Sequence, residues 1–288
     1  MKKIGTISAI WRYPVKGIAG ESIDSCAIDK NGLNGDRLFA VRDVARGEVQ
    51  SCKFRPGLLS CIARSINPQP IFDPESFEIE FSDGAVLPHG DDAMNNKISE
   101  LLGHESTLEP LRPRAEEDFY RRYKTDDHTW LDELKSTFTR EPGEPLPDFS
   151  NPTQDFIDYV TLAGTFFLVS PLHIITTASM QHFQTLQPDA DWDIRRFRPN
   201  IVIETVDGIN GLAEQAWLNE TLYIGETRIA CSSTAPRCGA VTRKQKGIPF
   251  DKSMLRTIVK EAEQNLGIYG GISGSGIMNV GDEVYISG

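Results

Sequence analysis

The chain has 288 residues, of which 39% are hydrophobic and 25% charged, and its formal net charge is −11. These values are typical of a soluble globular protein with one large or two ordinary domains. The acidic balance argues against broad nucleic-acid binding, and no apolar run is long enough to cross a bilayer.

The first part of the chain, to about residue 110, is predicted to be rich in β-strands. The segments are short, carry β-branched or aromatic residues, and are bounded by Gly, Pro or Asn. We expect strands over residues 4–12, 22–28, 37–43, 59–66, 77–81 and 107–110. Asp83-Gly84 predicts a hairpin turn, and the apolar spacing before Gly103 predicts a helix over residues 93–102.

Residues 112–155 differ in composition from the rest of the chain. They are charged and carry Pro142, Pro145, Pro147 and Pro152. We interpret them as a variable excursion or linker, partly helical, that is either poorly ordered or lies over a site.

Regular structure is expected again after this segment. We expect strands at 165–169 and 200–204, a hairpin of 217–224 with 227–230 through Gly225, and a hairpin of 277–280 with 283–286 through Gly281-Asp282. Two helices are predicted, at 176–186 with Thr176 or Thr177 as N-cap, and at 252–265, closed by Gly267. Many short strands and few helices favour a mixed, mainly β fold of the barrel type.

Two stretches near the N-terminus place cations on loops. Pro14 ends a strand and presents Lys16 beside Gly17, and Gly35-Asp36 presents Arg37. A lysine and an arginine on neighbouring loop ends suit a phosphate or another anion. The alternative is a pair of solvated surface cations.

A third cationic stretch, Arg195-Arg196-Phe197-Arg198-Pro199-Asn200, reverses the sign of this acidic chain. Its guanidinium groups suit a phosphate or diphosphate, or they pair at the surface with Asp189, Asp191 and Asp193. The predicted helix start from Thr176 to Ser179 offers hydroxyls and free N–H groups, which accept anions readily. Ordinary capping is the alternative there.

The five cysteines, Cys26, Cys52, Cys61, Cys231 and Cys238, show no CxxC spacing. This pattern argues against a disulfide framework and a zinc ribbon, and free thiols suit a reducing cytoplasm. Cys238 follows Arg237, and an adjacent cation favours the thiolate. One thiolate cannot fill a structural zinc site, but it suits a metal whose other ligands come from a cofactor. The alternative is a small buried hydrophobe.

Taken together, these motifs resemble the MOSC family, named for the C-terminal domain of molybdenum cofactor sulfurase. The resemblance rests on Tyr13-Pro14-Val15-Lys16, Gly32-Leu33-Asn34-Gly35-Asp36-Arg37, the 195–203 stretch, Glu214-Gln215-Ala216-Trp217 and Arg237-Cys238, in the right order. It implies an N-terminal β-barrel domain over 1–110 and a MOSC β-barrel domain over 111–288. It also brings a family-level association with pyridoxal phosphate binding.

The resemblance further implies a molybdenum-molybdopterin cofactor, with Cys238 as the metal ligand in the amidoxime-reducing branch. Residues carried over to the cofactor are Lys16, Gly17, Arg37, Thr176, Ser179, Arg198, Asn200 and Arg237. Gly17 stands where the family often has Ser, and Ala235 where a second cysteine is common, so the roles of those two side chains are in doubt.

The main functional hypothesis is an oxidoreductase that removes oxygen from N-hydroxylated or N-oxygenated small molecules in two-electron steps. No ferredoxin-like cysteine set follows Gly288, so electrons would come from a separate ferredoxin-, flavin- or haem-type protein. The alternatives are a sulfur or cofactor carrier using a persulfide or thiolate on Cys238, and an interaction module. We expect a cytoplasmic protein without a signal peptide, and neither nucleic acid nor membrane as partner.

Overall fold

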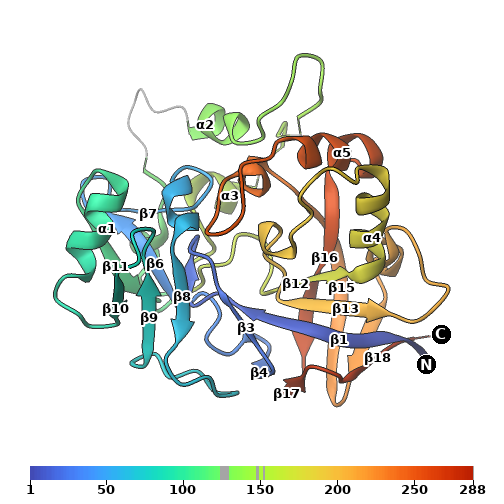
Figure 1. Cartoon of the computed structure of the whole chain (residues 1–288). Helices are drawn as coiled ribbons and strands as arrows, with labels where there is room; N and C mark the ends of the chain where they lie inside the picture. The colour runs from blue at the N-terminus through green and yellow to red at the C-terminus, as the bar shows by residue number, and fades with distance from the viewer. Residues whose placement is uncertain (124–129, 147–148, 152, 288) are drawn as a thin grey trace.

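The computed structural model describes residues 1–123, 130–146, 149–151 and 153–287, and these residues are mainly β-structure (Figure 1). The described helices are few and short, as the sequence predicts. They are α1 (Met94–Leu102), α2 (Trp130–Ser136), α3 (Gln154–Asp158), α4 (Thr177–Leu186) and α5 (Ser253–Ala262).

The largest sheet closes into a barrel. Its strands follow the order β13-β12-β16-β15-β14-β18-β1, and β1 pairs again with β13, so seven strands form a ring. They are β1 (Lys2–Arg12), β12 (Leu172–Thr176), β13 (Ile201–Thr205), β14 (Thr221–Ile224), β15 (Thr227–Pro236), β16 (Asn265–Ser273) and β18 (Glu283–Ile286). The expectation of a mainly β, barrel-containing fold is confirmed, and closure leaves the ring without a free edge.

Three smaller sheets accompany the barrel, in the orders β10-β9-β8, β11-β6-β2 with β7 on β6, and β17-β4-β5, while β3 extends the barrel sheet from β1. Their strands are β2 (Val15–Lys16), β3 (Glu21–Ile23), β4 (Ser25–Asp29), β5 (Gly32–Leu33), β6 (Phe39–Asp43), β7 (Glu48–Val49), β8 (Ile62–Ser65), β9 (Phe77–Glu80), β10 (Val86–Pro88), β11 (Ser106–Pro110) and β17 (Gly276–Asn279). Most of the first two sheets lie on the left of Figure 1, beside the barrel.

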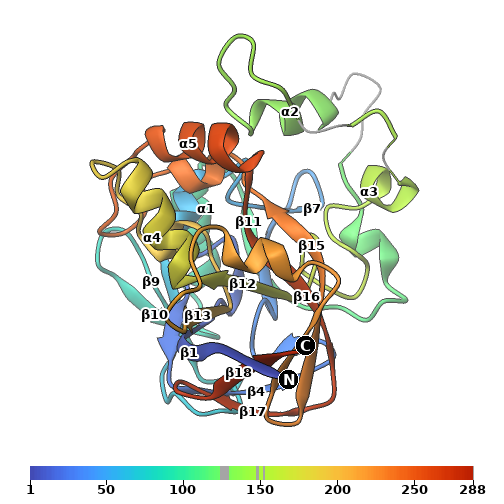
Figure 2. The same ribbon diagram turned by 90° about the vertical axis from the view of Figure 1, so that its right-hand side faces the viewer.

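The two ends of the chain meet in the barrel. Strand β1 lies between β13 and β18, and Lys2 pairs with Ile286, so the termini are neighbours (Figure 2). Strand β17, from the C-terminal part, pairs with β4 from the N-terminal part. The N-terminal and C-terminal parts therefore interlock, and a domain boundary near residue 110 stays a prediction.

Most predicted elements are confirmed, including α1, the Gly225 hairpin and α4 with Thr176 as its N-cap. Some expectations were wrong, among them the single strand expected at 22–28, which is divided into β3 and β4. The strand expected at 165–169 begins only at Leu172. The predicted C-terminal hairpin does not form, because β17 pairs with β4 while β18 pairs with β1 and β14. Helix α5 ends at Ala262, before a left-handed Glu263, and Gly267 lies in β16.

Apolar side chains fill the barrel and the space beneath its helices. One cluster lines the barrel interior, with Ile7, Ile10 and Ile174 among its members, and a second packs α4 and α5 against it. Each fully buried aliphatic side chain contributes about 1.5–3 kcal/mol to folding. The barrel is therefore a packed core, and loops at the strand ends are left to form the site.

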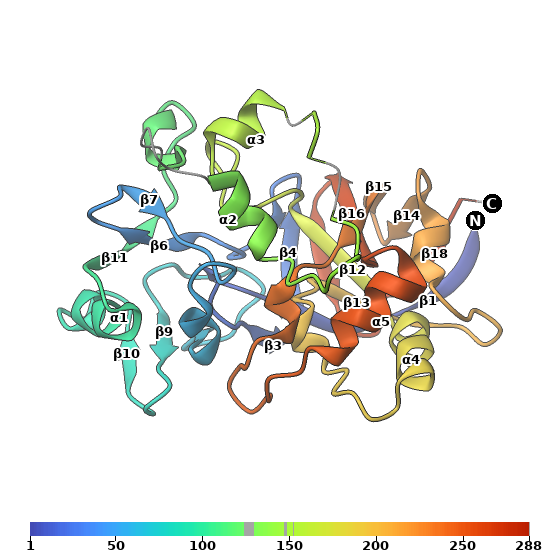
Figure 3. The ribbon, with the colours of Figure 1, turned by 90° about the horizontal axis from the view of Figure 1, so that it is seen from above.

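Parts of the 112–155 segment are ordered in the described residues, while Pro147 and Pro152 lie outside them. Helix α2 is followed by a stretch that runs beside α5, where Arg256 Nη2 donates to the Thr139 carbonyl at 2.6 Å (Figures 1 and 3). Whether the segment lies over a site stays a prediction. No helix in the described ranges combines the length and apolar character that a membrane span requires.

Candidate functional site

Tyr13 brings together two arginines that are far apart in the sequence. The guanidinium carbon of Arg198 lies 4.2 Å from the centre of the Tyr13 ring, and that of Arg37 lies 5.2 Å from it. The Tyr13 hydroxyl donates to the Pro199 carbonyl at 3.0 Å, which fixes the ring against the 195–200 stretch. The ring face attracts both cations, so Tyr13 holds Arg37 and Arg198 together. The sequence predicted the two arginines as site residues but did not indicate this role for Tyr13.

Lys16 completes a group that we call the cation cluster, consisting of Lys16, Arg37 and Arg198. Its side chain is buried, and its ammonium donates to the Phe166 carbonyl at 2.9 Å. Burial lowers the pKa of Lys16 to about 7, and the nearby Arg37 and Arg198 add to the effect. An anion bound here would offset that repulsion and favour the charged lysine.

Donors of the cation cluster are only partly used. Arg198 Nη1 donates to the Ile18 carbonyl at 2.8 Å, whereas its Nη2 is buried without a hydrogen-bond partner in the described structure. Burial lowers the pKa of the Arg198 guanidinium. A buried donor left unpaired is costly, and an anionic ligand would satisfy it.

Asp36 and Asn200 form the frame behind the cluster. Asp36 accepts from the Tyr13 backbone N–H at 2.8 Å and also pairs with the Arg37 guanidinium. Asn200 Nδ2 donates to Asp36 at 3.0 Å, and its Oδ1 accepts from the His173 N–H at 3.2 Å. Asn200 is thus placed close to the cluster, with its side chain engaged by the protein.

The three neighbouring arginines of the 195–198 stretch separate. Arg195 pairs with Asp193, and the buried Arg196 pairs with Asp191 and with backbone carbonyls, including Pro249 at 2.7 Å. Only Arg198 of these three joins the cation cluster. The surface-pair interpretation therefore holds for Arg195, and the anion-site interpretation remains for Arg198.

Cys238 lies in the loop between β15 and a short 3₁₀ helix (Gly239–Thr242), and it is half-buried with a free thiol. The guanidinium of Arg237 is turned inward, where it donates to the Ala235 and Phe197 carbonyls, both at 3.0 Å. Phe197 precedes Arg198, so Arg237 ties the cysteine loop to the segment that carries the cation cluster.

Three other cysteines are buried, unlike Cys238 and Cys52, which are half-buried. Burial raises the pKa of Cys26 and Cys61 to about 11 and that of Cys231 to about 12. These three thiols are packed in the interior and are poor nucleophiles or ligands.

Thr176 and Ser179 lie at the start of α4, but a protein carboxylate already engages them. Glu214 accepts from the Thr176 hydroxyl at 2.6 Å and from the Ser179 hydroxyl at 2.5 Å, and from the Gly267 N–H at 3.1 Å. Burial raises the pKa of Glu214. The structure thus groups these two hydroxyls with Glu214 and not with the cation cluster.

Gly17 explains how a segment that sequence reasoning missed reaches the site. It has φ of +82°, and a Cβ there would lie 3.0 Å from the Cys52 backbone N. The electrostatic effect of Cys52 raises the pKa of Lys16, whereas that of Lys53 lowers it. Cys52 also acts to raise the pKa of Arg198. In the sequence, the only feature that distinguishes Cys52 is the adjacent Lys53, and it does not reveal that this segment lies next to Gly17.

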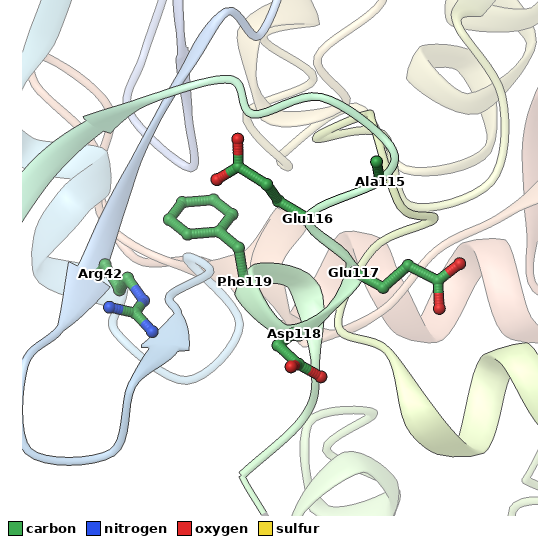
Figure 4. A pocket seen from close by; sticks show the side chains of 6 residues that line it. All are labelled: Arg42, Ala115, Glu116, Glu117, Asp118 and Phe119. Carbon is green, nitrogen blue, oxygen red and sulfur yellow. The ribbon is translucent and has the colours of Figure 1, made fainter.

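A surface hollow of about 550 Å³ lies elsewhere (Figure 4). It is lined by Arg42, Ala115, Glu116, Glu117, Asp118 and Phe119, and Arg42 stacks on the Phe119 ring at 5.2 Å. Its three carboxylates do not suit an anionic ligand, and it includes none of the predicted site residues.

The chain is 24% identical to mitochondrial amidoxime reducing component 2 of Macaca fascicularis over 99% of this chain and 84% of that protein, and the human protein matches equally. The rat protein of the same name is 26% identical with the same coverage. A solved structure, the YUAD protein from Bacillus subtilis, aligns over 98% of this chain and 95% of its own at 9% identity and a TM-score of 0.42.

Two family models match the chain. The MOSC N-terminal beta barrel domain matches residues 4–82, and the MOSC domain matches residues 162–285. Together they span more than half of the sequence, on either side of the excursion that carries α2 and α3, and the chain belongs to the MOSC domain family.

Proposed function

We propose that this protein is a molybdenum-cofactor-dependent reductase of N-hydroxylated or N-oxygenated small molecules. The observation that carries the proposal is the cation cluster, which Arg237 links to the loop that bears the free thiol of Cys238. Arg37 in the cluster pairs with Asp36, Arg198 keeps one buried donor unpaired, and Arg237 donates to the carbonyl of Phe197, the residue before Arg198. The relatives named amidoxime reducing components support the choice of reaction.

The residues present fit a phosphate-bearing cofactor with a thiolate-binding metal. The unpaired Arg198 donor and the repulsion among cations around buried Lys16 are both relieved by an anion. Among the described residues, no group of three or more His, Cys, Asp or Glu could hold a metal ion. A metal bound through Cys238 would therefore take its other ligands from the cofactor.

Each residue would have a separate task. Lys16, Arg37 and Arg198 would hold the phosphate, Cys238 would ligate the metal through its sulfur, and Tyr13 and Asp36 would keep the arginines in place. When bound, the cofactor supplies the two-electron chemistry of oxygen removal. A separate electron-donor protein would supply the electrons for each turnover.

The first test is metal analysis of the protein made in a molybdenum-replete host, with a known amidoxime-reducing protein prepared in parallel. We expect molybdenum and pterin fluorescence in the wild type. Cys238→Ser should lower bound molybdenum by at least about tenfold while the fold is kept, because a hydroxyl is a poor soft-metal ligand. Circular dichroism checks the fold.

Cys231→Ala is the control, since Cys231 lies in β15, the strand that leads into the Cys238 loop, but its side chain is in the barrel core. It should retain the metal. Wild-type protein without molybdenum and pterin, under conditions that load the known protein, would contradict the proposal. A reducible extra sulfur on Cys238 without pterin would instead favour the sulfur-carrier alternative.

A further inference from the structure

Both neighbours of Cys238 are tied by backbone hydrogen bonds to other segments. The Gly239 N–H donates to the Thr137 carbonyl at 2.7 Å. The Arg237 N–H donates to the Gln264 carbonyl, and Gln264 Nε2 donates back to the Arg237 carbonyl, both at 2.8 Å. The backbone is therefore fixed immediately before and after the thiol.

Arg140 connects these two attachments. Its Nη2 donates to the Gln264 side-chain oxygen, and its Nε donates to the Pro145 carbonyl at 2.7 Å. Its guanidinium also lies within electrostatic reach of Cys238. Residues 137–145, which we call the strap, thus contact the Gly239 side of the thiol through Thr137 and the Arg237 side through Arg140 and Gln264.

Helix α5 is also hydrogen-bonded to the strap. Arg256 donates to the Thr139 carbonyl and to Glu144, both at 2.6 Å, and to Glu141 at 3.1 Å. Figures 1 and 3 show the chain after α2 lying beside α5. The strap is therefore held at several points, so it can restrict the movement of the loop that carries Cys238.

The contact between the strap and the cysteine loop leaves no spare room. A Cβ at Gly239 would lie 2.4 Å from the Thr137 carbonyl oxygen, so the approach requires glycine. Thr139 adopts φ of +49°, an unusual backbone conformation for a β-branched residue. Its hydroxyl is buried without a partner in the described structure. Strain of this kind persists only where surrounding contacts enforce it.

We propose that the strap is the positioning element of the Cys238 loop and that Arg140 is its main positioning residue. The inference rests on the proposed function, in which Cys238 is the metal ligand. It assigns a role to a segment that both family models leave unmatched. Arg140 acts through Gln264 and the backbone, and it is not itself a ligand.

The test uses the full chain purified without molybdenum. Arg140→Gln removes a cation that favours the thiolate, so rates are compared per thiolate, from the pH dependence of alkylation. On that basis the variant should raise the rate of Cys238 alkylation by N-ethylmaleimide by about tenfold, because one charged hydrogen bond that restrains local opening is lost. Peptide mass mapping gives the rate for each cysteine. Half-buried Cys52 is the internal reference, and its rate should not change. Hydrogen exchange at the Gly239 amide should accelerate as well.

Two control variants separate positioning from general damage. Arg121→Gln removes an exposed guanidinium paired with Asp118, away from the strap, and should leave both rates unchanged. Arg140→Lys keeps the charge but loses the fork of donors, and should give an intermediate rate. In the molybdenum-loaded protein, Arg140→Gln should lower kcat more than it changes KM.

Unchanged Cys238 alkylation and Gly239 exchange in Arg140→Gln would overturn the proposal. If that variant does not fold, Arg256→Gln loosens the strap from its other side and must produce the same two changes. A wild type that never binds molybdenum would refute the proposed function alone, because alkylation and exchange are measured without the metal.

Discussion

The two parts of the candidate site are built differently. In the cation cluster, buried Lys16 has a lowered pKa and Arg198 keeps an unpaired donor. In the cysteine loop, the backbone on both sides of Cys238 is hydrogen-bonded to the protein. The first arrangement leaves a buried donor unpaired, whereas the second is hydrogen-bonded on both sides of the thiol. Under the proposed function, ligand affinity would reside mainly in the cluster and reactivity in the loop.

The largest effect is expected when the unpaired guanidinium is removed. Arg198→Leu should reduce retention of the pterin cofactor by about tenfold or more, because charged hydrogen bonds to the ligand are lost. The measurement is pterin fluorescence after release from a known amount of protein. Equal retention in the variant and the wild type would remove Arg198 from the binding site.

Arg195→Gln is the matched control for this variant. Arg195 is a close sequence neighbour but forms a partly exposed pair with Asp193, and pairs of this kind contribute only about 1 kcal/mol to stability. It should retain the cofactor. A similar loss in both variants would mean that the whole stretch acts by its net charge.

A pH-dependent effect is expected from Lys16 in the cofactor-free protein. Because its pKa falls from 10.5 to about 7 on folding, the folded state binds fewer protons than the unfolded state between those values. The free energy of unfolding of the wild type relative to Lys16→Met should therefore rise with pH from about 7 to 10, and level off below 7. Thermal unfolding at a series of pH values measures it.

Lys3→Met provides the comparison, since exposed Lys3 pairs with Glu283 and its pKa is raised. Its pH effect should be small and of opposite sign. Parallel curves for the wild type and Lys16→Met would show that Lys16 is not buried as a cation in this way.

The smallest effect tests the geometry beneath the cluster. Gly17→Ser should lower stability by about 1–3 kcal/mol, because φ of +82° is strained for serine and the new Cβ meets the Cys52 backbone. Gly84 has φ of +87°, and a Cβ added there would have no atom within 4 Å, so Gly84→Ser measures backbone strain without crowding. Chemical denaturation of both variants compares them, and an equal loss would show that the approach of Cys52 is not tight.

Much of the site was predictable because its residues occur in short motifs. Lys16 ends the short strand β2, Arg37 and Arg198 lie just before β6 and β13, and the motifs indicated that one anion could use all three. Partners farther away were not predictable. The spacing of apolar residues at 277–280 and 283–286 identified two strands, but it could not show that β17 pairs with β4.

The sequence by itself determined the short strands, the cap of α4 and the residue types that suit a phosphate and a soft metal. These are local properties, set by turns, side-chain period and chemistry within a few residues. Only the tertiary structure decided that Thr176 and Ser179 bind Glu214, that Tyr13 unites two arginines, and that Arg140 lies near Cys238. Such contacts join segments as much as 185 positions apart, from Tyr13 to Arg198, and depend on barrel closure and packing that no local pattern encodes.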